Sequence, residues 1–201
     1  RIGEKDMVEE GQSVTLGVEY SKKDLKNNDF LDLSLATVFR DKRIDDLPEK
    51  STIGNKKSNI VGNFNYRPSK FFNLEYEFSL SNNLKRSDYN LVKTNFNINN
   101  FVTSFEFLEE DNVVGNKSYI VNKSTLIFDE NNSISFKTNK NLDKNITEYY
   151  NLIYEYKNDC LTAALEYNKE YYMDNELKPE ENLFFSIKII PFGKINSPSI
   201  N

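Results

Sequence analysis

Residues 71–80, FFNLEYEFSL, alternate apolar and polar side chains over their whole length. Side chains of a β-strand point to opposite faces with a period of two, so this stretch predicts a strand with one apolar face. The apolar positions are Phe72, Leu74, Tyr76, Phe78 and Leu80, and the opposite positions are Phe71, Asn73, Glu75, Glu77 and Ser79. The stretch is as long as the ~9–11 residues that a tilted strand needs to cross a hydrocarbon layer.

The same alternation recurs along the chain, with turn residues between the segments. It predicts about eleven strands, at 13–20, 30–40, 59–67, 71–80, 88–98, 101–108, 118–128, 133–139, 146–156, 160–171 and 183–190. No stretch favours a helix, and no shift in composition marks a domain boundary. We therefore expect an all-β, antiparallel up-and-down meander over residues 1–193, followed by a flexible tail at 194–201.

The composition resembles that of a soluble protein, with 28% charged residues and a mean hydropathy of −0.66. That average is also compatible with a membrane β-barrel, in which only every second residue faces lipid. No apolar run is long enough for a transmembrane helix, and no apolar segment typical of a signal peptide follows Arg1. We therefore expect either a cytoplasmic chain or a piece of a longer exported protein.

Several classes of function lack the residues that they need. The chain has no histidine, which excludes a histidine triad and a histidine zinc site. It has no Gly-rich phosphate-binding motif, and its scattered lysines and net charge of −5 give no nucleic-acid footprint. We expect neither an enzyme nor a cofactor.

The connections between the predicted strands alternate between tight and longer ones. Tight connections are expected near Pro68, Asn99, Asn131 and Asn158, and longer ones near Lys50, Asn83, Asp111, Asp143 and Glu176. Outer-membrane barrels have short periplasmic turns and longer extracellular loops, so the alternation favours such a barrel. A soluble β-sandwich or barrel remains the alternative, because its strands alternate in the same way.

Three segments, 6–12, 67–69 and 154–162, resemble parts of a known family. The first, DMVEEGQ, resembles a D-R-x-E-x-G segment, and Arg67-Pro68-Ser69 resembles a Y-R-P or F-x-P turn. The third, YEYKNDCLT, resembles a penultimate hairpin that carries one or two cysteines. The family is that of the lipopolysaccharide (LPS) assembly protein LptD, with α-proteobacterial members closest. Met7 departs from it, because the family has arginine there.

The resemblance implies the C-terminal part of an outer-membrane barrel that inserts LPS into the outer leaflet through a lateral gate, without covalent chemistry. The implied partners are LPS, an LptE-like outer-membrane lipoprotein that plugs the lumen, and a periplasmic protein bridge that delivers LPS. It also implies a disulfide from Cys160 to the periplasmic domain; a buried, unpaired thiol is the alternative. A segment of a porin-like channel and a soluble β-rich binding domain remain alternatives for the function of the chain.

Two groups of residues are candidates for roles in transport. The last predicted strand would form one wall of the gate, and Pro191 would shorten its ladder because proline cannot donate a hydrogen bond. Its residues are Leu183, Phe185, Ser186, Ile187, Lys188, Ile189 and Pro191. The candidates for lining the lumen are Asn73, Glu75, Glu77 and Glu166. The run Glu109-Glu110-Asp111 could hold a divalent cation, but a solvated loop is the preferred interpretation.

Overall fold

The computed structural model describes residues 11–45, 47, 52–112, 115–171, 180–189 and 193–196, and nearly all of them are extended. A single 3₁₀ turn, η1, covers Thr52–Gly54 in this part of the chain. The strands are β1 Ser13–Lys23, β2 Asp29–Arg40, β3 Ile60–Ser69, β4 Phe72–Leu80, β5 Ser87–Ile98, β6 Phe101–Asn112, β7 Gly115–Ile127, β8 Asn132–Asn141, β9 Ile146–Lys157, β10 Leu161–Glu170, β11 Glu180–Ile189 and β12 Gly193–Asn196. The eleven predicted strands are thus confirmed with shifted ends, and β12 is an addition.

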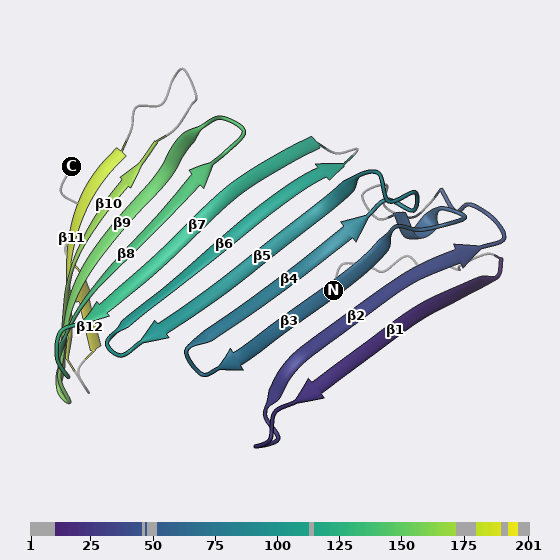
Figure 1. Cartoon of the computed structure of the whole chain (residues 1–201). Coiled ribbons are helices and arrows are strands. Elements are labelled where there is room, and N and C mark those ends of the chain that lie inside the picture. The colour runs from purple at the N-terminus through teal and green to yellow at the C-terminus, as the bar shows by residue number, and fades with distance from the viewer. Residues whose placement is uncertain are drawn as a thin grey trace. The chain divides into compact units, whose positions relative to one another are not determined.

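The strands follow one another in the sheet in the same order as in the sequence, from β1 to β12 (Figure 1). The pairs β1–β2, β2–β3, β7–β8, β8–β9, β9–β10, β10–β11 and β11–β12 are antiparallel. This arrangement confirms the predicted all-β up-and-down meander. Among the described residues, no helix has the length and apolar character needed to cross a membrane.

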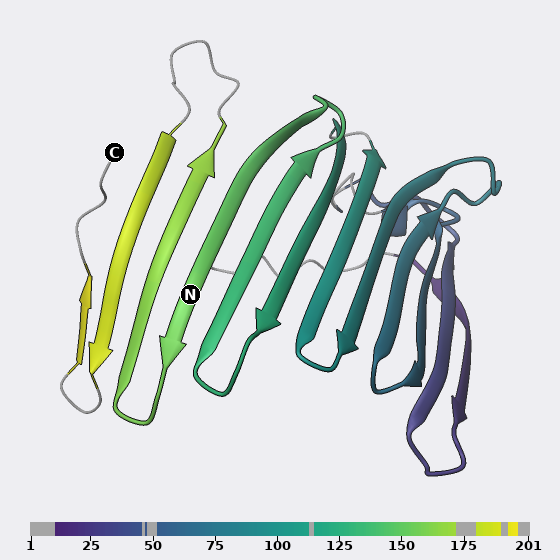
Figure 2. The same cartoon turned by 60° about the vertical axis from the view of Figure 1, so that its left-hand side comes forward.

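The chain divides into two compact units, which we describe separately. Unit 1 comprises Arg1–Tyr66, Glu75–Leu91 and Glu109–Lys117, and unit 2 comprises Arg67–Leu74, Val92–Leu108 and Ser118–Asn201. In unit 2, the green to yellow strands β8 to β11 lie side by side, and short turns at opposite ends join β8 to β9 and β9 to β10 (Figure 2).

Close packing in unit 1 requires a glycine in β3. A Cβ atom built at Gly62 would lie 2.3 Å from Cζ of Phe78 and 2.8 Å from Cδ2 of Leu35. Both side chains belong to the apolar positions of their strands, so the missing Cβ lets them meet over β3. An alanine there would have to displace an aromatic ring.

Two tight turns show how local chemistry ends the strands. Asn99 has a φ of 53°, which asparagine tolerates better than other residues with a side chain, and the Asn99-Asn100 turn is as predicted. The turn predicted at Pro68-Ser69 lies instead at Lys70-Phe71, because β3 continues to Ser69. The register of β3 with β2 ends at Tyr66, so Pro68 lies beyond this ladder and its missing donor costs little there.

The predicted long loop at 109–117 is wrong. β6 continues to Asn112 and β7 begins at Gly115, so the expected alternation of tight and long connections breaks here. The backbone ladder needs no apolar side chains, and the polar run Glu109-Glu110-Asp111 therefore continues the strand without a visible period. A strand that extends beyond an apolar layer can be polar on both faces, which is why its sequence looks like a loop.

Candidate functional site

The strands of unit 2 have an apolar face, which we define by Leu152, Tyr154, Leu165, Tyr167, Leu183 and Phe185. The register aligns Tyr154, Leu165 and Phe185 across β9, β10 and β11, and cross-strand partners share a face. Their exposed fractions are 43%, 45% and 47%. Bulky apolar side chains are thus left uncovered in a continuous row, which is typical of a surface that contacts lipid or a partner.

The opposite, polar face of these strands carries a hydrogen-bonded cluster around Glu166. Nδ2 of Asn151 donates to Oε1 of Glu166 at 2.7 Å, and Nδ2 of Asn168 donates to the same oxygen at 3.1 Å. Asn151 is only 6% exposed. Glu166, one of the candidates for lining a lumen, therefore takes part in a side-chain network on the polar face.

The other lumen candidates lie on β4, where Asn73, Glu75 and Glu77 alternate with the apolar positions. Glu77 lines a hollow of about 840 Å³ in unit 1, together with Glu19 of β1. The rest of that hollow is lined by Thr15, Gly17, Ser34, Leu35, Ala36, Val61, Gly62, Asn63, Phe78, Ser79 and Tyr89. Many of these side chains are small, which leaves room above the sheet.

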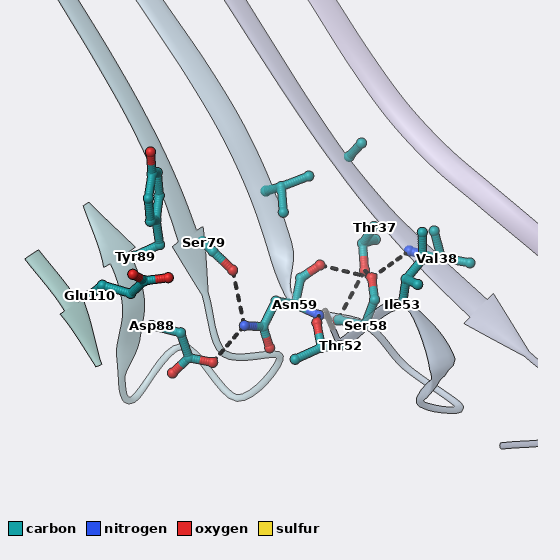
Figure 3. A pocket seen from close by; sticks show the side chains of 12 residues that line it. Thr37, Val38, Thr52, Ile53, Ser58, Asn59, Ser79, Asp88, Tyr89 and Glu110 are labelled. Atoms are coloured by element: carbon teal, nitrogen blue, oxygen red, sulfur yellow. Dashed lines mark hydrogen bonds between the residues drawn. The ribbon is translucent and has the colours of Figure 1, made fainter. Parts of the chain in front are cut away.

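A second hollow in unit 1, which we call the acidic pocket, has a volume of about 350 Å³ (Figure 3). It lies where the segment between β2 and β3 meets the ends of the neighbouring strands. Its lining comprises Ala36, Thr37, Val38, Thr52, Ile53, Ser58, Asn59, Val61, Ser79, Asp88, Tyr89 and Glu110. The two ionisable carboxyl groups are those of Asp88 and Glu110.

Asn59 holds the wall of the acidic pocket together (Figure 3). Its Nδ2 donates to Oδ2 of Asp88 at 2.7 Å and to Oγ of Ser79 at 3.0 Å. Nε of Arg86 donates to the other oxygen of Asp88 at 2.7 Å. The carboxylate is thus paired on both oxygens, and Asn59 is 6% exposed.

The segment before Asn59 is anchored to β2 in the same way. Oγ of Ser58 accepts a hydrogen bond from the backbone of Val38 at 2.8 Å and donates to the carbonyl of Asn59 at 2.8 Å. The sequence predicted a charged loop over 41–58, with no sign of this anchoring. Buried hydrogen-bonding partners do not follow from a polar composition alone.

Unit 2 has a hollow of a different character, which we call the lysine hollow. Its volume is about 610 Å³, and it lies on the polar face. Its lining comprises Lys93, Asn95, Ser104, Phe105, Glu106, Val121, Lys123, Lys137, Asn139 and Tyr149. These lysines are scattered along the sequence, and Lys93 occupies a polar position in its predicted strand. Only the pairing of strands brings them together.

The run Glu109-Glu110-Asp111, for which a divalent cation was only the less favoured interpretation, is divided by the strand. Glu109 accepts a hydrogen bond from Nδ2 of Asn90 at 3.1 Å, whereas Glu110 lines the acidic pocket. Adjacent strand residues point to opposite faces, so the two carboxylates diverge. Within the described ranges, no group of three histidine, cysteine, aspartate or glutamate residues is placed to hold a metal ion.

Cys160 lies in the tight turn between β9 and β10, and its side chain is exposed. Oδ1 of Asn158 shapes the turn, since it accepts hydrogen bonds from the backbone of Cys160 at 3.0 Å and of Leu161 at 2.8 Å. The alternative of a buried thiol is therefore wrong. An exposed thiol on a short, well-defined turn is accessible to a second chain or domain.

The predicted gate strand corresponds to β11, but β11 is not the last strand of the sheet. Its Leu183 and Phe185 belong to the apolar face and are 39% and 47% exposed. The register places Ser186 opposite Ala164 of β10 and opposite Asn196 of β12. β12 pairs with Ser186–Ile189, which includes Ile187 and Lys188. Pro191 lies outside the described residues.

Comparison with known proteins yields one family. A model of the LptD family, described as LPS transport system D, matches residues 1–114. The match includes two of the motifs recognised in the sequence, at 6–12 and 67–69, and the hairpin at 154–162 lies beyond it. A search of curated proteins found no match.

Proposed function

The chain belongs to the LptD family of LPS transport proteins of the Gram-negative outer membrane, and on this premise we propose that it forms part of the barrel that inserts LPS into the outer leaflet. The observation that carries the proposal is the pair of faces in unit 2. An exposed apolar row such as Tyr154, Leu165 and Phe185 suits contact with acyl chains, and the polar face behind it suits contact with sugars. Transport of this kind needs no covalent step, in keeping with a family of transporters rather than enzymes.

The lateral gate would use β11 as one wall, with β12 covering part of its edge. LPS is amphiphilic, so a gate must let acyl chains leave through the apolar side while the sugars stay on the polar side. Phe185 and Ile189 would face the acyl chains, and Ser186 and Lys188 would face the lumen. Because β12 is paired over only four residues, it adds few hydrogen bonds that would have to break.

The polar face would receive the lumen partners. The Glu166 cluster and Asn73 in unit 2, and separately Glu75 and Glu77 in unit 1, offer polar groups to an LptE-like lipoprotein that fills the barrel. A periplasmic bridge protein would deliver LPS to the barrel from the periplasmic side. The exposed apolar row argues against the alternative of a soluble binding domain, which would have to cover it.

Cys160 would form a disulfide with the periplasmic domain of the full-length protein. Its exposure on a tight turn supports this role. The full-length protein should then migrate differently on non-reducing and reducing gels, and Cys160→Ser should remove that difference. Quantitative alkylation of Cys160 in the native protein, together with unchanged migration, would reject the disulfide.

A disulfide across the seam, the junction between the first and last strands of the closed barrel, tests the gate. We call this disulfide the seam lock. Since β12 occupies the edge beside Ser186, the lock is better placed at Asn182, ahead of β12 and on the polar face. Asn182→Cys would be combined with a facing cysteine on the first strand of the intact barrel. We expect the oxidised lock to stop the appearance of new LPS at the cell surface and reduction to restore it.

The matched control joins two strands that the gate does not separate. Asn168 and Asn182 are register partners in β10 and β11, so Asn168→Cys with Asn182→Cys introduces a disulfide inside one wall. This control should leave transport unchanged. Normal LPS export with the seam lock fully formed would show that β11 is scaffold and that the gate lies elsewhere.

A further inference from the structure

The lysine hollow gathers positive charge from three separate strands. Lys93 comes from β5, Lys123 from β7 and Lys137 from β8. Glu106 is the one carboxylate in the lining, and its Oε2 lies 4.0 Å from Nζ of Lys93. Three lysines minus one glutamate leave a formal charge of +2 in the lining.

Two of these lysines are direct neighbours with no compensating charge. Lys123 and Lys137 are register partners in the antiparallel pair β7–β8. Like charges directly opposite each other destabilise a sheet. Nζ of Lys137 lies over the ring of Tyr149, 5.7 Å from its centroid, which is a weak compensation at an exposed site. In the described part of the chain, neither lysine has a carboxylate within ion-pair distance.

The hollow also contains a buried acceptor that lacks a donor. Oδ1 of Asn139 is buried and has no hydrogen-bond partner among the described residues. A buried polar atom of this kind is costly unless something satisfies it. The lysines can only donate, whereas Oδ1 of Asn139 needs a donor, so the matching ligand carries both anionic oxygens and a hydroxyl group.

We propose that the lysine hollow binds a phosphorylated sugar, with the phosphate between Lys123 and Lys137 and a sugar hydroxyl donating to Asn139. The volume of about 610 Å³ is within the range of small-molecule pockets, about 300–1,000 Å³. Resting on the proposed function, the ligand in the cell is the phosphorylated sugar region of LPS as it passes the polar face. The hollow then binds the head group transiently on the polar face while the acyl chains move along the apolar face of the same strands.

Calorimetric titration of the full-length protein in detergent tests the chemistry of the hollow. The probes are N-acetylglucosamine 1-phosphate, N-acetylglucosamine and inorganic phosphate. We expect the phosphorylated sugar to bind most tightly, because it alone satisfies both the lysines and Asn139. Lys123→Gln or Lys137→Gln should weaken its binding by about tenfold, as expected for a lost charge-assisted hydrogen bond.

Lys157→Gln is the matched control, since Lys157 lies at the end of β9 and outside the lining of the hollow. It should leave the affinity unchanged. Absence of binding, equal binding of inorganic phosphate and the phosphorylated sugar, or an equal loss in Lys157→Gln would overturn the proposal. Tighter binding of a hexaglutamate peptide would assign the hollow to an acidic protein partner instead, which also overturns it.

Photo-crosslinking in cells separates this proposal from the proposed function. A photoreactive p-benzoylphenylalanine is placed at Asn95, in the hollow, or at Ser186, on the polar side of β11. The proposal is supported if LPS crosslinks at Asn95 and if this crosslink is lost when Lys123→Gln and Lys137→Gln are combined. Crosslinking at Ser186 alone overturns the hollow and leaves transport intact, whereas crosslinking at neither position counts against both.

Discussion

The acidic pocket of unit 1 and the lysine hollow of unit 2 are both built from strand residues, yet their polar groups are used differently. In the acidic pocket, Asp88 is paired by Asn59 and Arg86, and its side chain is only 12% exposed. In the lysine hollow, Lys123 faces Lys137 and Asn139 has an unused acceptor. Polar groups that satisfy one another hold a structure together, whereas groups left unsatisfied are available to a ligand.

Both hollows lie on a sheet whose polar and apolar faces are expected to have different surroundings. A charge placed on the apolar face of unit 2 should therefore cause the largest loss of stability. Leu165→Lys puts a lysine in the middle of the exposed apolar row. A lysine on the lipid face near the middle of the bilayer costs about 2–4 kcal/mol. We expect that loss in the free energy of unfolding, measured by urea titration in lipid vesicles with far-UV circular dichroism.

Ala164→Lys, one residue away on the polar face, is the control for this substitution. Its register partner in β9 is Glu155, so the new charge meets a carboxylate. It should change the free energy of unfolding little. Equal losses for the two variants would mean that the two faces do not differ in their contact with lipid.

Asn59→Ala is expected to have the next largest effect, because it breaks the satisfied network. The change leaves a buried carboxylate oxygen of Asp88 without its donor, which costs about 1–3 kcal/mol. The same urea titration should show that loss. Asn95→Ala, in the lysine hollow, removes an exposed amide and should stay within about 0.5 kcal/mol of the unmodified protein.

Lys123→Glu, in the lysine hollow, is expected to raise the free energy of unfolding and not to lower it. It replaces a like-charged cross-strand pair by an opposite-charged one with Lys137, and such pairs differ by about 0.2–1 kcal/mol. We expect a gain of that size in the free energy of unfolding, with loss of phosphorylated-sugar binding. A loss of stability instead would mean that Lys123 already has a structural partner.

The smallest effect concerns acid pH and is confined to unit 1. The backbone N–H of Gln12 donates to Oδ1 of Asp41 at 2.9 Å and lowers the pKa of that carboxyl below its ordinary value. The contribution of Asp41 to stability is therefore complete above the pKa of the unfolded chain and is lost as the pH falls through the lower, folded pKa. Carbon-13 NMR of the Asp41 carboxyl should show that low midpoint, and Asp41→Asn should remove this part of the acid response.

The alternation of side chains was sufficient to predict eleven of the strands and their apolar faces. FFNLEYEFSL has one extended conformation that puts its apolar residues together, and the same holds for the segments that became β1 and β10. Asn99-Asn100 likewise carries its own turn signal, because asparagine tolerates a positive φ. Such features depend on residues that are close in the chain, so they are present in the sequence itself.

The strand of Glu109-Glu110-Asp111 and the short β12 have no such local signal. Where both faces of a strand are polar, alternation disappears, and the ladder to the neighbouring strand is what keeps the chain extended. The family resemblance likewise rested on local motifs, two of which lie within the matched residues 1–114. It carried no information about the two hollows.

The hollows were decided only by tertiary structure. Alternate residues of a strand point to opposite faces, so the sequence shows which face Lys123 and Lys137 occupy. The register that sets them opposite each other joins residues of different strands and is not visible in either strand alone. The acidic pocket needs Asn59 to reach Asp88, 29 residues away along the chain. Side chains that meet through strand pairing have no fixed spacing in sequence, so a site made of them exists only once the sheet is assembled.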